Sequence, residues 1–206
     1  MYTKIVKRFI DVLLSLLGLI VLSPVYLLIF IAIKMDSKGS AIFVQKRVGK
    51  NKCIFNIYKF RSMYIDTPKN MPTHMLQEVD SHITKVGKLL RKYSLDELPQ
   101  IFNILKGDMS IIGPRPALWN QYDLIEERDK YGANDVRPGL TGYAQISGRD
   151  ELPIDVKAKF DGEYVLNMSF WFDVKLFFAT ILSVIKHDGV VEGGVADAKT
   201  EKEQVN

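Results

Sequence analysis

The segment Val12–Ile33 reads VLLSLLGLIVLSPVYLLIFIAI and contains no charged residue. Its length matches the roughly 20 apolar residues that a helix needs to cross a bilayer. The run is too long for the apolar core of a signal peptide, and no small-x-small cleavage site follows it. The alternative is a buried core helix, but apolarity on every side suits lipid better than a half-exposed helix. The sequence therefore predicts a membrane helix.

Two features of this segment argue against a simple transmembrane span. Ser23-Pro24 lies near its centre, where proline removes a helical hydrogen bond and kinks the helix. Basic residues flank both ends, so the positive-inside rule gives no preferred direction. They are Lys4, Lys7 and Arg8 before the segment and Lys34, Lys38, Lys46 and Arg47 after it. We predict a re-entrant helix hairpin that bends at Ser23 and Pro24 and returns to the same cytoplasmic face.

The overall composition limits the chemistry of the remaining chain. The 206 residues support one domain with its own core. A net charge of +4 suits an anionic membrane or phosphorylated ligands, and it is too small to indicate nucleic-acid binding. The single cysteine, Cys53, excludes an intramolecular disulfide and a multi-cysteine zinc site. The three histidines are too scattered to form a metal-binding pair.

We predict an α+β fold that is mainly helical, with a re-entrant anchor over residues 1–38 and a cytoplasmic catalytic domain over 39–191. Residues 192–206 are polar and are expected to form a disordered tail. A small β-hairpin is expected, together with a mobile polar loop and three short helices. The hairpin strands are Ala41–Gln45 and Ile54–Phe60, the loop is Asp66–Asp80, and the helices are Ile83–Lys92, Leu98–Leu105 and Tyr122–Tyr131.

A second apolar segment, Ser169–Lys186, is rich in aromatic residues but carries Asp173 and Lys175. These charges disfavour insertion across a bilayer, whereas aromatic and basic residues together are typical of an amphipathic interfacial helix. Packing of the same helix against the core explains the pattern equally well. The sequence leaves both interpretations open.

The adjacent carboxylates Asp96 and Glu97 form the strongest candidate for a catalytic pair. Ser94 and Glu97 also have the S-x-x-E spacing of a helix-capping box, which is a purely structural role. Pro99 argues against that role, because it would fall at the fifth helical position and lose a hydrogen bond. A helix that starts at Asp96 places Pro99 in the first turn, where its missing N–H costs nothing. Glu97 is then available to bind a metal or to act near a phosphate.

Several basic residues beside proline or glycine provide candidate phosphate contacts. Gly113-Pro114-Arg115-Pro116 holds an arginine between two prolines, and Arg137 is followed by Pro138-Gly139. A guanidinium in a rigid turn is suited to bidentate contact with phosphate. Each turn alone has an ordinary structural explanation, but together they favour a pocket for an anionic ligand. The candidates are Arg115, Arg137, Lys59 and Arg149. Walker, GxGxxG and GxSxG motifs are absent.

These motifs, in this order, resemble the small monotopic phosphoglycosyl transferases, the bacterial sugar transferases that initiate capsule, O-antigen or glycoprotein glycan synthesis. Tyr143 departs from the tryptophan of many members. The resemblance covers about residues 4–192. It rests on Lys7-Arg8-x-x-Asp11, Ser23-Pro24, Gln45-x-Arg47-x-Gly49, Tyr58-Lys59-Phe60-Arg61-Ser62-Met63, Leu95-Asp96-Glu97-Leu98-Pro99-Gln100, Lys106-Gly107-Asp108-Met109-Ser110, Gly113-Pro114-Arg115-Pro116 and Arg137-Pro138-Gly139-Leu140-Thr141-Gly142.

The resemblance implies an enzyme of the bacterial inner membrane that transfers a sugar 1-phosphate from a UDP-sugar to undecaprenyl phosphate and releases UMP. It implies Asp96 as the nucleophile of a covalent phosphosugar intermediate and Glu97, with Asp96, as a ligand of Mg²⁺. Small members often use N-acetylated amino-deoxy sugars, which favours such a donor here. The glycan pathway, the oligomeric state and binding of downstream glycosyltransferases stay open.

Two other functions are compatible with parts of this pattern. A nucleotide-sugar glycosyltransferase would normally carry an Asp-x-Asp metal motif, which the sequence lacks, and would release UDP. A non-catalytic membrane scaffold would not need Asp96 and Glu97. The identity of the released nucleotide separates the first alternative, and replacement of the carboxylates separates the second.

Overall fold

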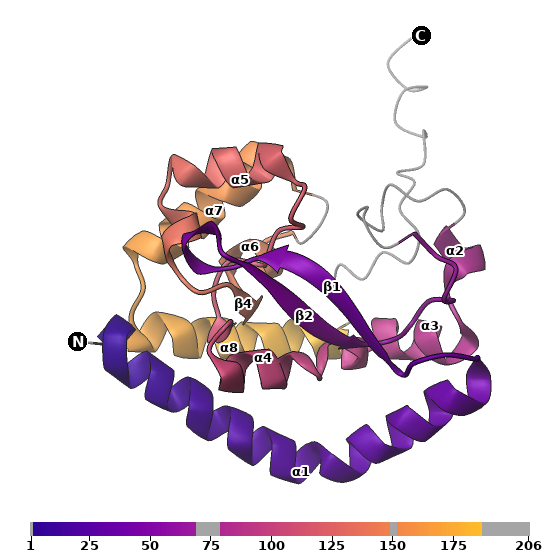
Figure 1. Cartoon of the computed structure of the whole chain (residues 1–206). Helices are drawn as coiled ribbons and strands as arrows, with labels where there is room; N and C mark the ends of the chain where they lie inside the picture. The colour runs from indigo at the N-terminus through magenta and orange to yellow at the C-terminus, as the bar shows by residue number, and fades with distance from the viewer. Residues whose placement is uncertain (1, 69–78, 149–151, 187–206) are drawn as a thin grey trace, which may run out of the picture.

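The computed structural model describes residues 2–68, 79–148 and 152–186. A π-helical turn at Tyr2–Val6 leads into the long helix α1, and the remaining elements form a compact body above it (Figure 1). The helices are α1 (Lys7–Asp36), α2 (Val79–His82), α3 (Lys85–Lys92), α4 (Gln100–Lys106), α5 (Tyr122–Asp129), α6 (Tyr143–Ile146), α7 (Ile154–Leu166) and α8 (Phe170–Lys186). The strands are β1 (Ile42–Val48), β2 (Ile54–Phe60), β3 (Ser110–Ile112) and β4 (Gly139–Thr141). The predicted α+β, mainly helical class is confirmed.

Helix α1 contains the uncharged segment and bends near its middle (Figure 1). Pro24 lies inside the helix, and the Ser23 hydroxyl donates to the Ile20 carbonyl over 2.8 Å. Proline leaves carbonyls of the preceding turn without an N–H donor, and a nearby hydroxyl reduces that deficit. Within the described residues, α1 is the one helix long and apolar enough to cross a membrane, and only 11% of its most apolar window is buried. This exposure excludes the interpretation of α1 as a core helix.

The N-terminal end of α1 is fastened to the body by polar contacts. Lys7 Nζ donates to Asp173 Oδ2 of α8 over 2.6 Å. Arg8 donates to the carbonyls of Ile104 and Leu105, the last turn of α4, over 2.5 and 2.9 Å. A guanidinium at a helix C-terminus satisfies carbonyls that have no partner within the helix.

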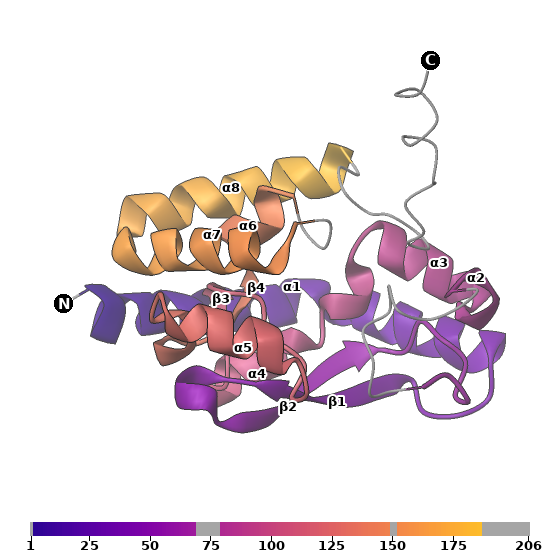
Figure 2. The same ribbon diagram turned by 90° about the horizontal axis from the view of Figure 1, so that it is seen from above.

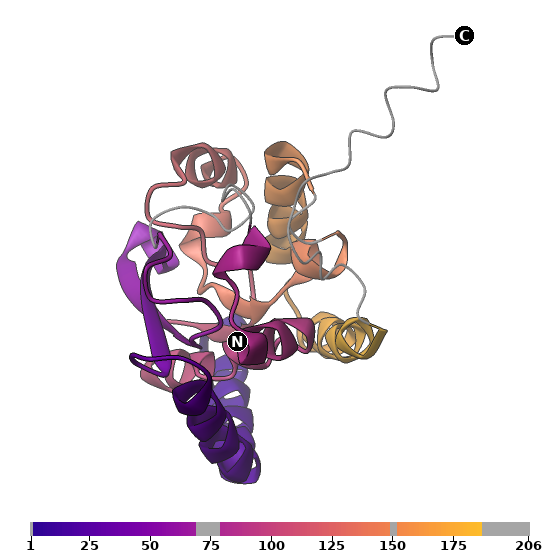
Figure 3. The same cartoon turned by 90° about the vertical axis from the view of Figure 1, so that its right-hand side faces the viewer.

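The C-terminal end of α1 is fastened to the same body. The Arg61 guanidinium caps this end by donating to the carbonyls of Ser37 and Lys38. Asp36 accepts the backbone N–H of Val86 at the start of α3 over 3.0 Å. Both ends of the apolar helix therefore contact one domain, and the bend between them forms the lower edge of the molecule in Figures 1 and 3.

Two small sheets position the segments between the helices. Strands β1 and β2 form the predicted antiparallel hairpin, with Ile42 opposite Phe60 and Val48 opposite Ile54. Strands β3 and β4 pair in parallel, with Ser110 opposite Gly139. Buried side chains of β2, α4 and Met109 form one cluster that joins the hairpin to α4.

Helix α8 packs on the core, as one of the two interpretations of its sequence predicts. It runs alongside the first half of α1 and stacks on α7 (Figure 2). Leu176 and Asp173 are buried against the core, whereas Trp171 is 77% exposed. Lys175, Phe178, Leu182 and Ile185 are exposed on the same face at helical spacing. One face thus packs on the core, and the opposite face presents aromatic and aliphatic side chains.

Some predicted boundaries differ from the structure. Helix α3 begins at Lys85 rather than Ile83, because the Thr84 hydroxyl accepts the Gly87 N–H and caps the helix there. Part of the predicted loop Asp66–Asp80 is helical, since α2 starts at Val79. Residues 69–78 of that loop and the predicted tail 192–206 lie outside the described residues.

Candidate active site

The two candidate carboxylates lie in a 3₁₀ turn over Leu95–Glu97, just before α4. The predicted start of an α-helix at Asp96 is therefore wrong by one turn, because α4 begins at Gln100 with Pro99 as its N-cap. Pro99 still lies where no helical N–H is required, as its missing donor demands. Ser94 adopts a left-handed conformation with φ of 54° and makes no capping hydrogen bond through its side chain. The capping-box role for Ser94 and Glu97 is excluded.

Glu97 is held between two cations from distant parts of the chain. Lys59 Nζ of β2 donates to Glu97 Oε1 over 2.7 Å, and Arg115 Nη2 donates to the same oxygen over 3.0 Å. The Glu97 and Lys59 side chains are largely buried, whereas the Arg115 side chain is 36% exposed. The structure thus brings together four predicted residues: Asp96, Glu97, Lys59 and Arg115.

The electrostatics of this cluster distinguish the two carboxylates. Burial alone would raise the pKa of Glu97, but the Arg115 and Lys59 cations outweigh it and hold the pKa of Glu97 well below its ordinary value. Burial raises the pKa of Asp96, and the nearby negative charge of Glu97 adds to this effect. Glu97 is therefore an anion paired with two cations, while the charged form of Asp96 is less stabilised by its surroundings.

The position of Lys59 is set by a buried amide of α4. Asn103 Oδ1 accepts the N–H of Tyr58 over 3.0 Å, and Asn103 Nδ2 donates to the carbonyl of Asn56 over 2.7 Å. Asn103 thereby satisfies backbone groups along β2, the strand that carries Lys59. This side chain is fully buried and fixes the distance between β2 and α4.

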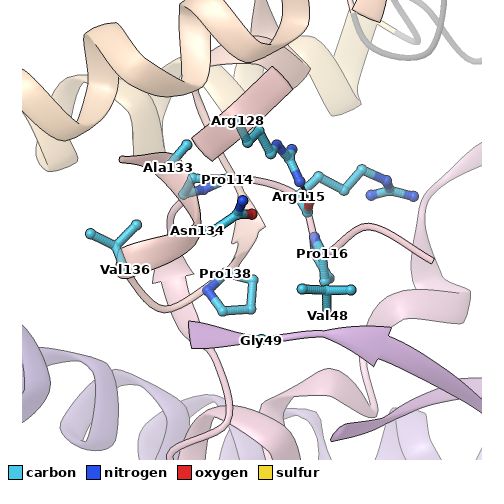
Figure 4. A pocket seen from close by; sticks show the side chains of 10 residues that line it. All are labelled: Val48, Gly49, Pro114, Arg115, Pro116, Arg128, Ala133, Asn134, Val136 and Pro138. Atoms are coloured by element: carbon cyan, nitrogen blue, oxygen red, sulfur yellow. Dashed lines mark hydrogen bonds between the residues drawn. The ribbon is translucent and has the colours of Figure 1, made fainter. Parts of the chain in front are cut away.

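Arg115 is positioned by a second buried group that sequence reasoning missed. Arg128 of α5 donates to the Arg115 carbonyl over 2.9 Å and pairs with Asp161 of α7 over 2.5 Å. Figure 4 shows the Arg115 side chain extending away from the pocket that Pro114, Pro116 and their neighbours line. The Pro-Arg-Pro segment is therefore a rigid element whose backbone is held by Arg128. Arg128 and Asp161 are 33 residues apart and belong to no recognisable motif, so the sequence contained no signal for this pair.

One further candidate phosphate-binding residue, Arg137, does not join this cluster. Arg137 Nε donates to the Gly107 carbonyl over 2.9 Å, at the opposite end of α4 from Glu97. The glycines after it serve close packing, because a Cβ at Gly139 or Gly142 would lie about 2 Å from the backbone of Gly113. Arg149 lies outside the described residues.

The cluster lies directly beside the bend of α1. Tyr26, two residues beyond Pro24, donates its hydroxyl to the carbonyl of Leu98 over 2.6 Å. Its ring contacts Phe60 of the hairpin at a centroid distance of 5.5 Å. Leu98 follows Glu97 immediately, so the acidic turn is attached to the part of α1 that leaves the bend.

The donor set around Asp96 is compatible with Mg²⁺ of the kind that binds together with substrate phosphates. Such ions take one or two protein carboxylates and complete their coordination with phosphate oxygens and water. Among the described residues, no group of three or more His, Cys, Asp or Glu could hold a metal by itself. The adjacent Asp96 and Glu97 could provide two carboxylates, since both cations of the cluster bind a single oxygen of Glu97.

Comparison with known proteins defines the class. Residues 2–187 match the family model of the bacterial sugar transferases, and the chain belongs to this family. It is 40% identical over 193 residues to the exopolysaccharide production protein ExoY of Sinorhizobium fredii, covering 86% of this chain and 84% of the relative. It is 40% identical over 185 residues to the undecaprenyl-phosphate glucose phosphotransferase of Komagataeibacter xylinus, covering 85% of this chain and 35% of the relative.

A third relative is the undecaprenyl-phosphate galactose phosphotransferase of Salmonella typhimurium, which is 35% identical over 202 residues. That match covers 91% of this chain and 42% of the relative. The chain therefore spans less than half the length of several curated relatives that it matches. Membership of this family agrees with the resemblance of its motifs, and α1 is long and apolar enough to cross a membrane.

Proposed function

We propose that this protein transfers a sugar 1-phosphate from a UDP-sugar to undecaprenyl phosphate and releases UMP. The observation that carries the proposal is the Asp96–Glu97 turn, in which Lys59 and Arg115 bind Glu97 next to a bent apolar helix. Fixed cations beside an acidic pair suit a substrate with a charged diphosphate. The activities for which the Komagataeibacter and Salmonella relatives are named support the same reaction class.

In this proposal Asp96 is the nucleophile. A carboxylate oxygen of Asp96 attacks the sugar-bearing phosphorus, and the bond from that phosphorus to the bridging oxygen breaks, so that UMP leaves with the electron pair. A phosphate oxygen of undecaprenyl phosphate then attacks the same phosphorus and displaces the carboxylate. The protein returns to its starting state, and the sugar 1-phosphate is joined to the lipid phosphate as a diphosphate.

The other residues of the cluster orient the charges around this phosphorus. Asp96 and Glu97 would hold Mg²⁺, which when bound neutralises diphosphate charge and stabilises the leaving group. Lys59 fixes Glu97 from β2 and is largely buried. Arg115 is more exposed and presents a planar fork suited to a phosphate. Arg137, which binds the Gly107 carbonyl, and Arg149 are the less strongly supported candidates for contact with a substrate phosphate.

We propose that the protein is monotopic and lies at the cytoplasmic face of the bacterial inner membrane. Both ends of α1 contact one domain, so a helix that crossed the bilayer would separate contacts such as Lys7–Asp173 and Arg61–Ser37. A straight helix of 30 residues would be about 45 Å long, whereas each arm of the bent helix enters only about half of the hydrocarbon layer. The bend therefore leaves the Asp96 turn at the surface, where a lipid phosphate lies.

The test is product identification with the purified chain in lipid nanodiscs. The chain is incubated with undecaprenyl phosphate, Mg²⁺ and single UDP-sugars, including glucose, galactose and N-acetylated amino-deoxy sugars. We expect UMP release with at least one donor, dependent on the lipid, and favour an N-acetylated amino-deoxy sugar. Release of UDP would indicate a conventional glycosyltransferase. Equal activity of wild type and Asp96→Asn would show that the Asp96–Glu97 pair is not catalytic.

A further inference from the structure

An apolar groove lies between the first half of α1 and α8, with β3 as its floor. It has a volume of about 160 Å³. Its walls are aliphatic and aromatic side chains, among them Ile10 and Leu14 of α1 and Val174, Phe177 and Phe178 of α8. An apolar cavity of about 150 Å³ is large enough to hold one benzene molecule. The groove thus accommodates a hydrocarbon fragment of about that size, comparable to one isoprene unit.

The groove opens toward exposed apolar side chains of α1 and α8. Leu14 is 42% exposed and Phe178 is 60% exposed. These walls continue along α1 into the exposed residues Leu13 and Leu17 and along α8 into Leu182. Figures 1 and 2 show α8 running alongside this half of α1. A hydrocarbon chain in the bilayer therefore has direct access to the groove.

The charged residues at the end of the groove are already paired within the protein. Lys7 binds Asp173 over 2.6 Å, and Asp173 also accepts the hydroxyls of Tyr2 and Tyr164. Asp11 accepts the backbone N–H of Ile111 over 3.0 Å. A phosphate headgroup placed here would have to displace these contacts. The groove is therefore suited to the tail of a lipid and not to its headgroup.

The groove and the acidic turn lie close enough together for one long ligand to reach both. Arg8, next to Lys7, binds the last turn of α4, and Glu97 precedes the first turn of the same helix. Along α1, Leu14 of the groove and Tyr26, which binds Leu98 beside the acidic turn, are about 18 Å apart. A polyprenyl chain whose phosphate lies at Asp96 is long enough to run along α4 and reach the groove.

We propose that this groove binds a proximal isoprene unit of the polyprenyl phosphate acceptor and so selects for long acceptors. The inference rests on the proposed function, because it assigns a binding site for the tail of that acceptor. The polyprenyl tail enters the groove from lipid and not from water. Its binding energy therefore comes from packing against the groove walls, and not from removing apolar surface from water. The acceptor is the occupant because its tail is apolar and its phosphate would be held at the acidic turn, from which that tail reaches the groove.

The experiment compares two acceptors in nanodiscs, undecaprenyl phosphate and a short prenyl phosphate that ends before the groove. Val174→Phe fills the groove, and Phe177→Leu reshapes one wall with a smaller risk of misfolding. Val21→Phe is the matched control, because Val21 is 72% exposed on α1 and does not line the groove. Each variant is first checked for wild-type thermal unfolding. UMP release is then measured against the concentrations of both acceptors and of the UDP-sugar.

We expect Val174→Phe to raise the KM for undecaprenyl phosphate about tenfold, the lower end of effects in hydrophobic pockets. The KM for the UDP-sugar and the kcat/KM for the short acceptor should stay at wild-type values. Phe177→Leu should show the same selectivity with a smaller shift, and Val21→Phe should show none. Equal losses of kcat/KM with both acceptors would overturn the inference. Unchanged kinetics in both groove variants would also overturn it, and would indicate that phospholipid acyl chains occupy the groove. Failure of the proposed function itself would appear differently, as no UMP release by the wild type with either acceptor.

Discussion

Replacement of Lys7 by methionine tests how the bent helix is held against the catalytic body. The Lys7–Asp173 pair is 2.6 Å long, and its side chains are only 11% and 9% exposed. Removing one partner of a buried ion pair costs about 3–5 kcal/mol, because the other charge remains buried without compensation. The hydroxyls of Tyr2 and Tyr164 still donate to Asp173, so we expect the lower end, about 3 kcal/mol. For a chain of this size that loss lowers the Tm by about 6–12 °C.

The assay is thermal unfolding of the purified protein in one detergent, followed by intrinsic fluorescence. Lys130→Met is the matched control, because Lys130 is 64% exposed in its pair with Glu127 and should change stability by less than about 0.5 kcal/mol. The double variant Lys7→Met/Asp173→Leu should regain much of the lost stability, since no buried charge is left alone. A Tm of Lys7→Met equal to that of the control would refute the reasoning, as would a double variant whose loss equals the sum of two large single losses.

Three further outcomes are expected. Arg115→Lys keeps the charge but loses the planar fork, so the initial rate of UMP release should fall at least about tenfold. If Arg115→Lys and Arg115→Ala both release UMP at nearly the wild-type rate, the Pro-Arg-Pro segment is only a structural turn. Tyr26→Phe removes the hydrogen bond to Leu98 and should cost about 1 kcal/mol in denaturant unfolding, and an unchanged midpoint would show that this contact is not stabilising. Replacing Ser23 and Pro24 by Ala and Leu should straighten α1, and cysteine-accessibility labelling should then find its two flanks on opposite faces, with lower activity; labelling of both flanks from the cytoplasm would contradict this.

Local sequence signals predicted much of the fold. The uncharged run with its central proline predicted a bent apolar helix, because side-chain polarity and the missing proline N–H act within a few residues. The hairpin of β1 and β2 and the end of α4 at Gly107 are local in the same way; Gly107 has φ of 97°, which favours glycine. The start of α4 was misplaced by one turn, because Leu95–Glu97 forms a 3₁₀ turn whose geometry depends on tertiary contacts.

The residues of the site could be predicted from their types and motifs. Their arrangement in space could be predicted less well. Glu97 meets Lys59 and Arg115 across 38 and 18 residues of chain, a distance that no periodicity encodes. Arg137 carries an equally suggestive motif, yet it binds the Gly107 carbonyl. The buried groups that hold the cations in place, such as Asn103, lie in stretches without a recognisable pattern. Their role follows from packing between elements, which single-sequence reasoning does not reach.

The most direct test of the account is to trap the covalent intermediate. The chain in nanodiscs is incubated with its UDP-sugar and Mg²⁺ but without undecaprenyl phosphate, and the intact protein is weighed by mass spectrometry. We predict an added sugar phosphate on the wild type, located on the peptide that contains Asp96, and lost when undecaprenyl phosphate is supplied. Asp96→Asn should remain folded and unlabelled, because an amide does not attack phosphorus. Turnover by Asp96→Asn at the wild-type rate, or an adduct on another residue, would contradict the central claim.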